Sequence, residues 1–272
     1  LPKLSVSFDV TARSKIYASV AKGYKSGGYN TQMFSDVLQQ RIMQEMGMSA
    51  KYDVDDVVGY LPEKSLNYEL GAHINCCEDR LKADAAVFYI DCRDQQLTVF
   101  PEGTTTGRIM TNAGKTRSFG VEASLSFVPN DYWSLNASYG YTNARFVDFD
   151  NGKQDYSGNR LPYAPAHTAY VSASYSVPVN ASWLNRINLM VNCRGVGDIY
   201  WDEANDVRDP FYALLGASVR FEHERYSLDV WGENLTNTDY KTFYFVSIGH
   251  GFYQTGKPMQ VGATLRLNFE TK

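Results

Sequence analysis

Residues 259–269 alternate between apolar and polar positions along their whole length. The odd-numbered positions carry Val261, Ala263, Leu265, Leu267 and Phe269, and polar residues or glycine fill the even-numbered ones. Residues 117–127 repeat this pattern. Because successive side chains of a strand point to opposite faces, both segments predict a strand with one apolar and one polar face. A soluble β-sandwich and a transmembrane β-barrel with a polar lumen both need such strands.

The same period of two recurs through the chain and predicts about eleven strands. The links between these strands alternate in length. The short links are expected at residues 12–14, 77–80, 128–131, 178–183 and 223–224, with longer polar or glycine-rich segments between them. Strict alternation puts all short links at one end of the sheet and all long links at the other. Outer-membrane barrels are built in this way, whereas a sandwich distributes its loops more evenly, so the pattern favours a barrel.

The longest link, residues 31–60, interrupts the strand pattern. Within it, residues 35–48 show apolar positions at helical spacing after a serine that can cap a helix. The apolar side chains of this predicted helix include methionines, which pack in most proteins but can also contact a ligand. Its place on the long-link side predicts an external segment that takes part in ligand capture.

Composition narrows the class of protein. Aromatic residues make up 14% of the chain, chiefly because of 20 tyrosines, and tyrosine gathers where apolar surface meets water. No uninterrupted apolar run is long enough for a transmembrane helix. A net charge of −4 without a basic cluster argues against nucleic acid as a partner.

The reactive side chains form no recognisable catalytic or metal-binding pattern. The four cysteines include an adjacent pair, Cys76 and Cys77, and we expect all of them to be free or incidental. If Glu78 and Asp79 form a turn, Cys76 lies opposite a position near Leu81 on the next strand. No phosphate loop, nucleophile elbow or metal-ligand spacing is visible, so we expect no enzyme, no cofactor and no metal site.

Five segments, in this order along the chain, resemble those of one family. Residues 21–30 (AKGYKSGGYN) are similar to the GYKSGG-(F/Y)-N segment of TonB-dependent outer-membrane receptors, and residues 61–71 (LPEKSLNYELG) to their PE-x-x-x-x-YE-x-G segment. Residues 112–122 (NAGKTRSFGVE) resemble their NAG-x-x-x-x-x-GVE strand. Residues 233–240 (ENLTNTDY) and 256–262 (GKPMQVG) resemble two segments near the end of the barrel.

This resemblance implies a fold, a location and a function. Receptors of this class have a 22-stranded barrel with a plugged lumen, so the chain resembles the C-terminal half of that barrel, without the N-terminal plug and the first barrel half. The resemblance, which is greatest to ferric-siderophore receptors of the pesticin type, implies TonB-energised uptake of an iron–siderophore complex across the outer membrane of a Gram-negative bacterium. Its partners would be outer-membrane lipid, the siderophore-type ligand and TonB, the last through the missing N-terminal region. A receptor for cobalamin, a sugar or a peptide, a passive channel, an adhesin barrel and a soluble lipid-binding β-protein remain alternatives.

Ligand binding in such a barrel falls to the external loops and the upper lumen. Aromatic side chains offer flat apolar contact there, and lysine or arginine attracts an anionic chelate. The candidate ligand-binding residues are Tyr24, Lys25, Tyr29, Tyr60, Arg108, Tyr200, Trp201, Tyr244, Phe252 and Tyr253. The alternative for each aromatic residue is packing within a loop or in the girdle at the membrane interface.

Overall fold

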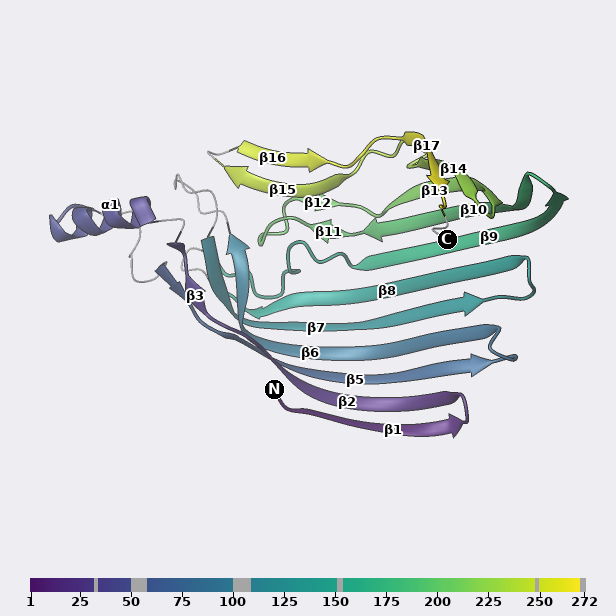
Figure 1. The fold of residues 1–272 in the computed structure, drawn as a ribbon. Coiled ribbons are helices and arrows are strands. Elements are labelled where there is room, and N and C mark those ends of the chain that lie inside the picture. Colours follow the sequence, from purple (N-terminus) through teal and green to yellow (C-terminus); the bar gives the residue numbers. More distant parts are fainter. Residues whose placement is uncertain (32–33, 50–57, 100–108, 151–153, 248–249, 270–272) are drawn as a thin grey trace.

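Eleven antiparallel strands form one sheet in the computed structural model, which describes all of residues 1–272 except 32–33, 50–57, 100–108, 151–153, 248–249 and 270–272 (Figure 1). The strands are β1 (Lys3–Thr11), β2 (Ser14–Lys25), β5 (Glu63–Cys76), β6 (Leu81–Val99), β7 (Ile109–Phe127), β8 (Trp133–Asp148), β9 (His167–Ala181), β10 (Leu184–Gly197), β13 (Tyr212–His223), β14 (Tyr226–Glu233) and β17 (Gln260–Leu267). Each pairs with its neighbours in chain order. The predicted number of strands and the all-β class are confirmed.

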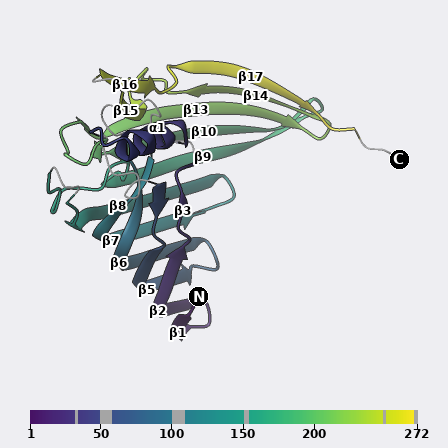
Figure 2. The same cartoon turned by 90° about the vertical axis from the view of Figure 1, so that its left-hand side faces the viewer.

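The sheet curves but does not close. Seen from the loop end, its strands follow an arc from β1 to β17 (Figure 2). In the described part of the chain, β1 and β17 each pair on one side only. The described residues contain no helix long and apolar enough to cross a membrane.

The short links all lie at one end of the strands, as predicted. Three boundaries differ from expectation. Ser14, expected in the first link, belongs to β2 and pairs with Thr11. β9 continues through Pro178 to Ala181, because the pairing of Pro178 with Arg186 lies next to a register shift that lets the strand go on. β13 includes His223, which pairs with Tyr226, so the turn falls one residue later than expected.

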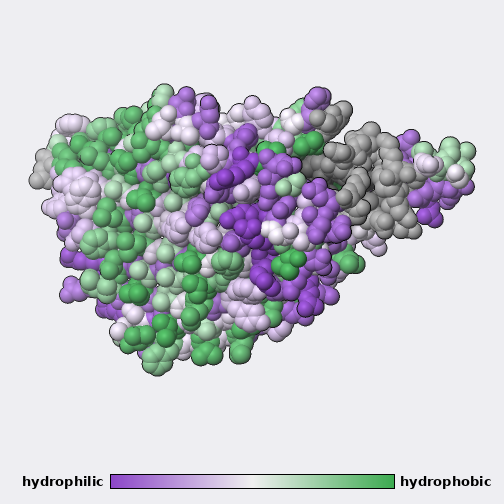
Figure 3. All heavy atoms as spheres, turned by 180° about the vertical axis from the view of Figure 1, so that it is seen from behind, coloured by the Kyte–Doolittle hydropathy of each residue, from purple (hydrophilic) through white to green (hydrophobic). Residues whose placement is uncertain are grey.

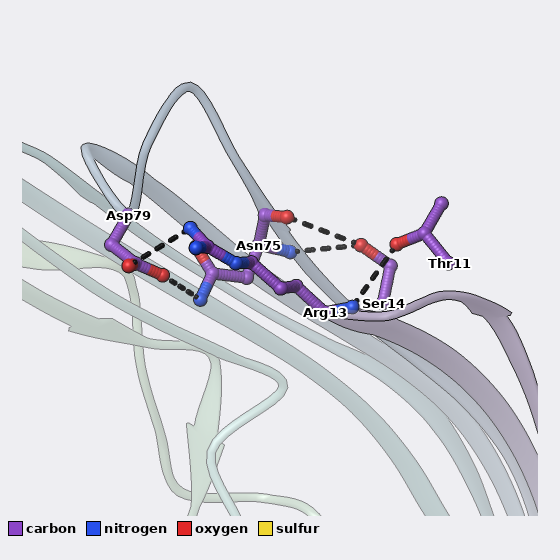
Figure 4. Close-up of polar contacts among 5 residues, drawn as sticks. All are labelled: Thr11, Arg13, Ser14, Asn75 and Asp79. Atoms are coloured by element: carbon purple, nitrogen blue, oxygen red, sulfur yellow. Dashed lines mark hydrogen bonds and ion pairs between the residues drawn. The ribbon is translucent and has the colours of Figure 1, made fainter.

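The turn between β5 and β6 confirms the pairing of Cys76 with Leu81. Cys77, Glu78 and Asp79 all have left-handed backbone, with φ of 57°, 57° and 66°, and the turn is tied to its neighbour. Arg13 Nη1 lies 3.0 Å from Asp79 Oδ2, while the hydroxyl of Ser14 bonds to the backbone of Asn75 (Figure 4). All four cysteines, which lie among the described residues, carry free thiols.

The two faces of the sheet differ as the alternation predicts. Along β17, Val261 and Leu265 are 73% and 62% exposed on the outer face, and Leu265 pairs with Leu228. On the inner face Arg220 Nε donates to Asp229 Oδ1 at 2.5 Å, and Arg266 bonds to the other oxygen of that carboxylate. The sheet therefore presents an apolar convex wall and a polar concave wall, which is what lipid outside and water inside require.

A cluster of buried apolar side chains lies at the loop end rather than between layers. It consists of Ala113, Ala144, Phe146, Phe149 and Leu161. The segment after β8 folds back here, and its backbone bonds to that strand, for example from Leu161 N to Ala144 O at 3.0 Å. This cluster fixes the start of the elaborated loops that follow.

The long links contain structure that the periodicity did not predict. Three two-stranded hairpins stand beyond the main sheet: β3 (Gly28–Tyr29) with β4 (Gly59–Tyr60), β11 (Ile199–Tyr200) with β12 (Arg208–Asp209), and β15 (Lys241–Ser247) with β16 (His250–Thr255). Helix α1 (Phe34–Glu45) confirms the helix expected at 35–48 and protrudes at the loop end (Figure 1). Leu38 and Ile42 of α1, and Met46 directly after it, are exposed, so these three apolar side chains are not buried by packing against the described part of the chain.

Candidate functional site

Two of the long links, residues 154–166 and the β11–β12 hairpin, are bonded into one unit at the loop end. Tyr163 N donates to Tyr200 O at 2.8 Å. Arg160 N donates to Asn205 Oδ1 at 2.7 Å, and Asn205 Nδ2 returns a bond to Arg160 O at 3.0 Å. The amide of Asn159 donates to Glu203 O at 2.9 Å. These backbone and side-chain bonds hold the two loops, which are far apart in the sequence, in one fixed arrangement.

An aromatic cluster joins the β15–β16 hairpin to this unit. The ring of Tyr163 stacks on Phe243, with centroids 5.7 Å apart, and meets Trp201 edge-on at 5.5 Å. Phe245 continues the cluster toward Phe252, which stacks on it at 5.3 Å. Offset and edge-to-face pairs at these separations are favourable beyond their buried area. We call Tyr163, Trp201, Phe243, Phe245 and Phe252 the loop aromatic cluster.

Polar bonds lock the same joint. The hydroxyl of Tyr163 donates to Tyr244 O at 2.6 Å. Trp201 Nε1 donates to Asp209 Oδ2 at 3.1 Å, and Lys241 Nζ reaches the other oxygen of Asp209 at 2.5 Å. Burial raises the pKa of Tyr163 to about 12, which further favours the protonated hydroxyl that donates the bond to Tyr244 O. Three loops therefore form one ordered platform.

Cations lie beside two tyrosine rings on this platform. Lys241 Nζ is 5.8 Å from the ring centroid of Tyr253, which is 60% exposed. The guanidinium of Arg208 is 5.8 Å from the ring of Tyr200 and bonds to Asp198 at 2.5 Å, which raises the pKa of Arg208. Flat rings next to fixed positive charge suit an aromatic, anionic ligand.

The structure brings together half of the ten residues predicted for binding. Tyr200, Trp201, Tyr244, Phe252 and Tyr253 all belong to the platform. Phe252 is 46% exposed, whereas Trp201 is only 5% exposed and uses its N–H within the chain. Trp201 therefore packs inside the platform, whereas Phe252 and Tyr253 lie on its surface.

Four other predicted residues lie at the opposite side of the strand order, on β2, β3 and β4. Tyr29 is 74% exposed at the β3–β4 hairpin. Tyr60 packs against Gly28, where a Cβ would come within 2.5 Å of the Tyr60 hydroxyl. Lys25 pairs with Glu63 on the inner face. The predicted residue Arg108 lies outside the described residues.

Tyr24, the fourth residue of this group, lies on the outer face of β2. It shares its parity along the strand with Ile16 and Val20, and it is 52% exposed. Outward aromatic side chains near the strand ends form the girdles of outer-membrane barrels. Its position fits a girdle residue better than a lumen contact.

The segments that resemble family motifs fasten the loops to the sheet. Asn30 exchanges two bonds of 2.8 Å with the backbone of Met110. Asn112 likewise exchanges bonds with the backbone of Leu61, at 2.7 and 3.1 Å. The buried amide of Gln96 donates to Ser26 O at 2.8 Å and to Leu61 O at 3.1 Å. Residues of three motifs thus meet at one end of β6 and β7.

Asn234 fastens the last long link, between β14 and β17, to the sheet. It is 5% exposed with φ of 48°, and its amide donates to Thr238 O and Lys257 O, each at 3.0 Å. Asn237 accepts a bond of 2.9 Å from Met259 N. Both asparagines hold the two ends of this link together below the β15–β16 hairpin.

The inner wall carries a second polar group. Tyr17 stacks on His73 at 5.1 Å and donates to Glu69 Oε1 at 2.7 Å, and His73 Nδ1 lies 2.5 Å from Asp84 Oδ1. Tyr17, His73 and Asp84, together with Glu122, line a shallow hollow in the concave face. Within the described residues, no group of three or more His, Cys, Asp or Glu side chains is arranged to hold a metal ion.

Sequence reasoning missed Tyr163, Lys241, Asp209 and Phe243. The run of three aromatic residues at 243–245 was a usable signal of the β15 strand. Asp209 and Lys241 carried none, because their pairing depends on how two loops meet.

The curved sheet, apolar outside and polar inside, with ordered loops at one end, defines part of an outer-membrane β-barrel. A family model described as "TonB dependent receptor-like, beta-barrel" matches residues 1–235, and the chain belongs to this family. The expected location in the outer membrane of a Gram-negative bacterium follows. The family is one of receptors, in agreement with the expectation that the chain is not an enzyme.

Several characterised proteins are similar over almost the whole chain. The pesticin receptor of Yersinia enterocolitica is 31% identical over 272 residues, which cover 99% of this chain and 36% of that protein. The ferric yersiniabactin uptake receptor FyuA from Yersinia pestis has a TM-score of 0.77 at 26% identity, over 98% of this chain and 37% of that one. The siderophore receptor PiuA from Acinetobacter baumannii, at 18% identity and a TM-score of 0.70 over 97% of this chain and 35% of its own, shares the fold. The chain thus spans little more than a third of the length of these relatives.

Proposed function

We propose that the chain is the C-terminal part of the barrel of an outer-membrane receptor that takes up a ferric siderophore with energy from TonB. The observation that carries this proposal is the match over 99% of the chain to a pesticin receptor. A ferric yersiniabactin uptake receptor is also similar in structure over nearly the whole chain. In this proposal the plug and the segment that contacts TonB belong to parts of the receptor outside these residues.

The platform supplies the chemistry that such a ligand needs. Many ferric chelates combine aromatic or heterocyclic donor groups with net negative charge. Exposed Phe252 and Tyr253 and half-buried Tyr200 match the first property, and Lys241 and Arg208, each of which also pairs with an aspartate, match the second. The rigid joint below them limits the conformational entropy that binding would cost. Platform residues are the proposed ligand contacts, together with Tyr29 on the β3–β4 hairpin.

The segment with α1 is the proposed capture element. It lies on the loop side, and the exposed Leu38, Ile42 and Met46 give it an apolar surface that no described residue covers. Methionine side chains adapt to irregular partners. The segment is anchored at both ends, through Asn30 and Leu61, so its movement would not disturb the sheet.

The test is ligand binding and uptake by the full-length receptor in outer membranes. A panel of iron-loaded chelates that includes ferric yersiniabactin and ferrioxamine should identify one that binds and is imported only when TonB is present. Replacement of residues 31–58 by a short link should weaken binding and leave barrel assembly intact, as judged by heat-modifiable gel mobility. Phe252→Ala with Tyr253→Ala should do the same, and Tyr132→Ala, an exposed tyrosine at the opposite end, is the matched control. An assembled receptor that binds cobalamin, a sugar or a peptide but no ferric chelate would refute the proposal.

A further inference from the structure

Six cations from five neighbouring strands share the outer face near the loop end: Lys22, Lys64, Arg93, Lys115, Arg117 and Arg145. Four of them, on β5, β6 and β7, form the centre of this group. Lys64 of β5 pairs with Arg93 of β6, which pairs with Lys115 of β7. Arg117 follows on the same face of β7, where it pairs with Asp91. Lys64, Arg93 and Arg117 are exposed and Lys115 is half-buried. We call these four residues the outer basic patch.

The parity of each strand shows that the patch faces outward. Lys64 continues the exposed row of Leu66, Tyr68 and Leu70 along β5. Arg117 continues the row of Phe119 and Val121 along β7. Its guanidinium also lies 5.7 Å from the ring centroid of Tyr89, another outward side chain. The same surface that presents apolar side chains to lipid therefore turns basic toward the loops.

The height of the patch coincides with the upper edge of the apolar band. Ile74 and Phe127 mark the other end of the same rows on β5 and β7, each ten residues from Lys64 and Arg117. Ten residues extend about 33 Å along a strand, and the usual tilt of barrel strands reduces this to about 25 Å of height, the thickness of the apolar band. Figure 3 shows this face, with hydrophobic side chains over its broad part and a hydrophilic zone next to the end that carries α1.

The charges of the patch are only partly compensated within the chain. Lys115 Nζ lies 3.1 Å from Asp91 Oδ2, and among the described residues no carboxylate forms an ion pair with Lys64 or Arg93. Like charges directly opposite each other on a sheet are unfavourable, and the chain as a whole is acidic, with a net charge of −4. In the described strands, no Lys or Arg shares the outer face of β9, β10, β13, β14 or β17. The concentration of positive charge is thus specific to one sector of the wall.

We propose that the outer basic patch binds the phosphate groups of a phosphorylated glycolipid of the outer leaflet. Phosphate accepts bonds from both lysine and arginine, and arginine can bind it bidentately. A headgroup phosphate lies at the border between the acyl chains and water, which is the height of the patch. The acyl chains would lie on Leu66, Tyr68 and Phe119 directly below.

The proposal is tested with the purified full-length receptor and three probes. The probes are phosphatidylethanolamine vesicles with lipid A that carries both phosphates, the same vesicles with dephosphorylated lipid A, and inorganic phosphate alone. The phosphorylated lipid should be retained by the receptor and raise its melting temperature, and the other two probes should not. The variant with Lys64→Gln, Arg93→Gln, Lys115→Gln and Arg117→Gln should lose most of this retention, at least severalfold.

Lys82→Gln is the matched control, because Lys82 is an exposed lysine of β6 on the inner face near the opposite end. Heat-modifiable mobility verifies that each variant is assembled. If the fourfold variant does not assemble, the double variant with Lys64→Gln and Arg93→Gln is used in its place. Equal retention by the patch variant and the control would overturn the proposal. Equal stabilisation by inorganic phosphate would also overturn it, because the site would then recognise a free anion rather than a lipid. Ligand uptake is not measured, so the result is independent of the proposed transport function.

Discussion

Lys241 and Asp209, which belong to two different loops, form an ion pair of 2.5 Å at the centre of the loop platform. Their side chains are 31% and 16% exposed. Asp209 also accepts the indole N–H of Trp201 at 3.1 Å. The pair therefore connects the β15–β16 hairpin to the β11–β12 hairpin at the place where the loop aromatic cluster packs.

Lys241→Met should loosen this joint. Asp209 would keep one donor and lose its charged partner, so the free energy of local opening should fall by about 1–2 kcal/mol. Hydrogen exchange of the β11–β12 and β15–β16 amides measures this loss. Lys257→Met removes an exposed lysine from the same link and is the control. Similar exchange in both variants would show that the pair does not hold the loops together.

The platform should weaken as the pH rises above the ordinary range of a glutamic acid. Burial, with a smaller contribution from Asp202, raises the pKa of Glu203. The folded loop therefore favours the neutral form, and this stabilisation is complete below the unfolded pKa of about 4.3. It is lost as the pH rises from there through the raised pKa of the folded state. Loop hydrogen exchange between pH 4 and pH 7, corrected for its intrinsic pH dependence, should show this decline, and Glu203→Gln should remove it. If the loop stability of Glu203→Gln falls with pH as it does in the parent, another titratable group causes the effect.

Asn234 contributes both its side chain and its backbone conformation. Asn234→Gly should lose the bonds to Lys257 O and Thr238 O, at a cost of about 1–3 kcal/mol in local stability. Asn234→Ala should cost about 1 kcal/mol more, because alanine disfavours the left-handed conformation at φ of 48°. Hydrogen exchange at the start of β17 measures both variants. Equal losses would mean that the backbone conformation contributes nothing.

The sheet could be predicted from the sequence because one rule governs it. Lipid on one side and water on the other impose a period of two, and this pattern alone predicted eleven strands and the turn between Cys76 and Leu81. The strand boundary at Pro178 was wrong. A short link was expected to begin there, whereas the place of Pro178 beside a register shift lets the strand continue.

The platform and the outer basic patch could not be predicted in the same way. The strands β3, β4, β11 and β12 have only two residues each and are too short to show a period. Lys241 meets Asp209 only because three loops converge. Lys64, Arg93 and Lys115 are far apart in the sequence, so the chain shows no basic cluster until the register aligns them. The motif asparagines, such as Asn112, were noticed as a family resemblance, but the sequence did not show that they fasten the loops.

The facing of the last strand predicts unequal costs for neighbouring substitutions. Leu265→Arg places a charge on the outer face and should destabilise the assembled barrel by up to about 2–4 kcal/mol, the value at the midplane of the bilayer. Thr264→Arg points into the lumen, where it loses the bond of 3.3 Å from Trp231 Nε1, and should cost about 1 kcal/mol. Denaturant titration of the full-length receptor in lipid compares the two. Equal costs would contradict the assigned facing.

Residues 1–272 by themselves should not form a closed, functional barrel. An odd number of antiparallel strands leaves the first and the last strand parallel to each other, so β1 and β17 cannot complete an antiparallel barrel. Each open edge would leave backbone N–H and C=O groups without partners, which is very unfavourable in hydrocarbon. The isolated segment should therefore aggregate, pair with a second copy, or become ordered only beside the other half of the barrel. Refolding into lipid, followed by gel mobility with and without heating and by ferric-chelate binding, tests this. A monomeric, heat-modifiable species that binds a ferric chelate tightly would refute the half-barrel interpretation.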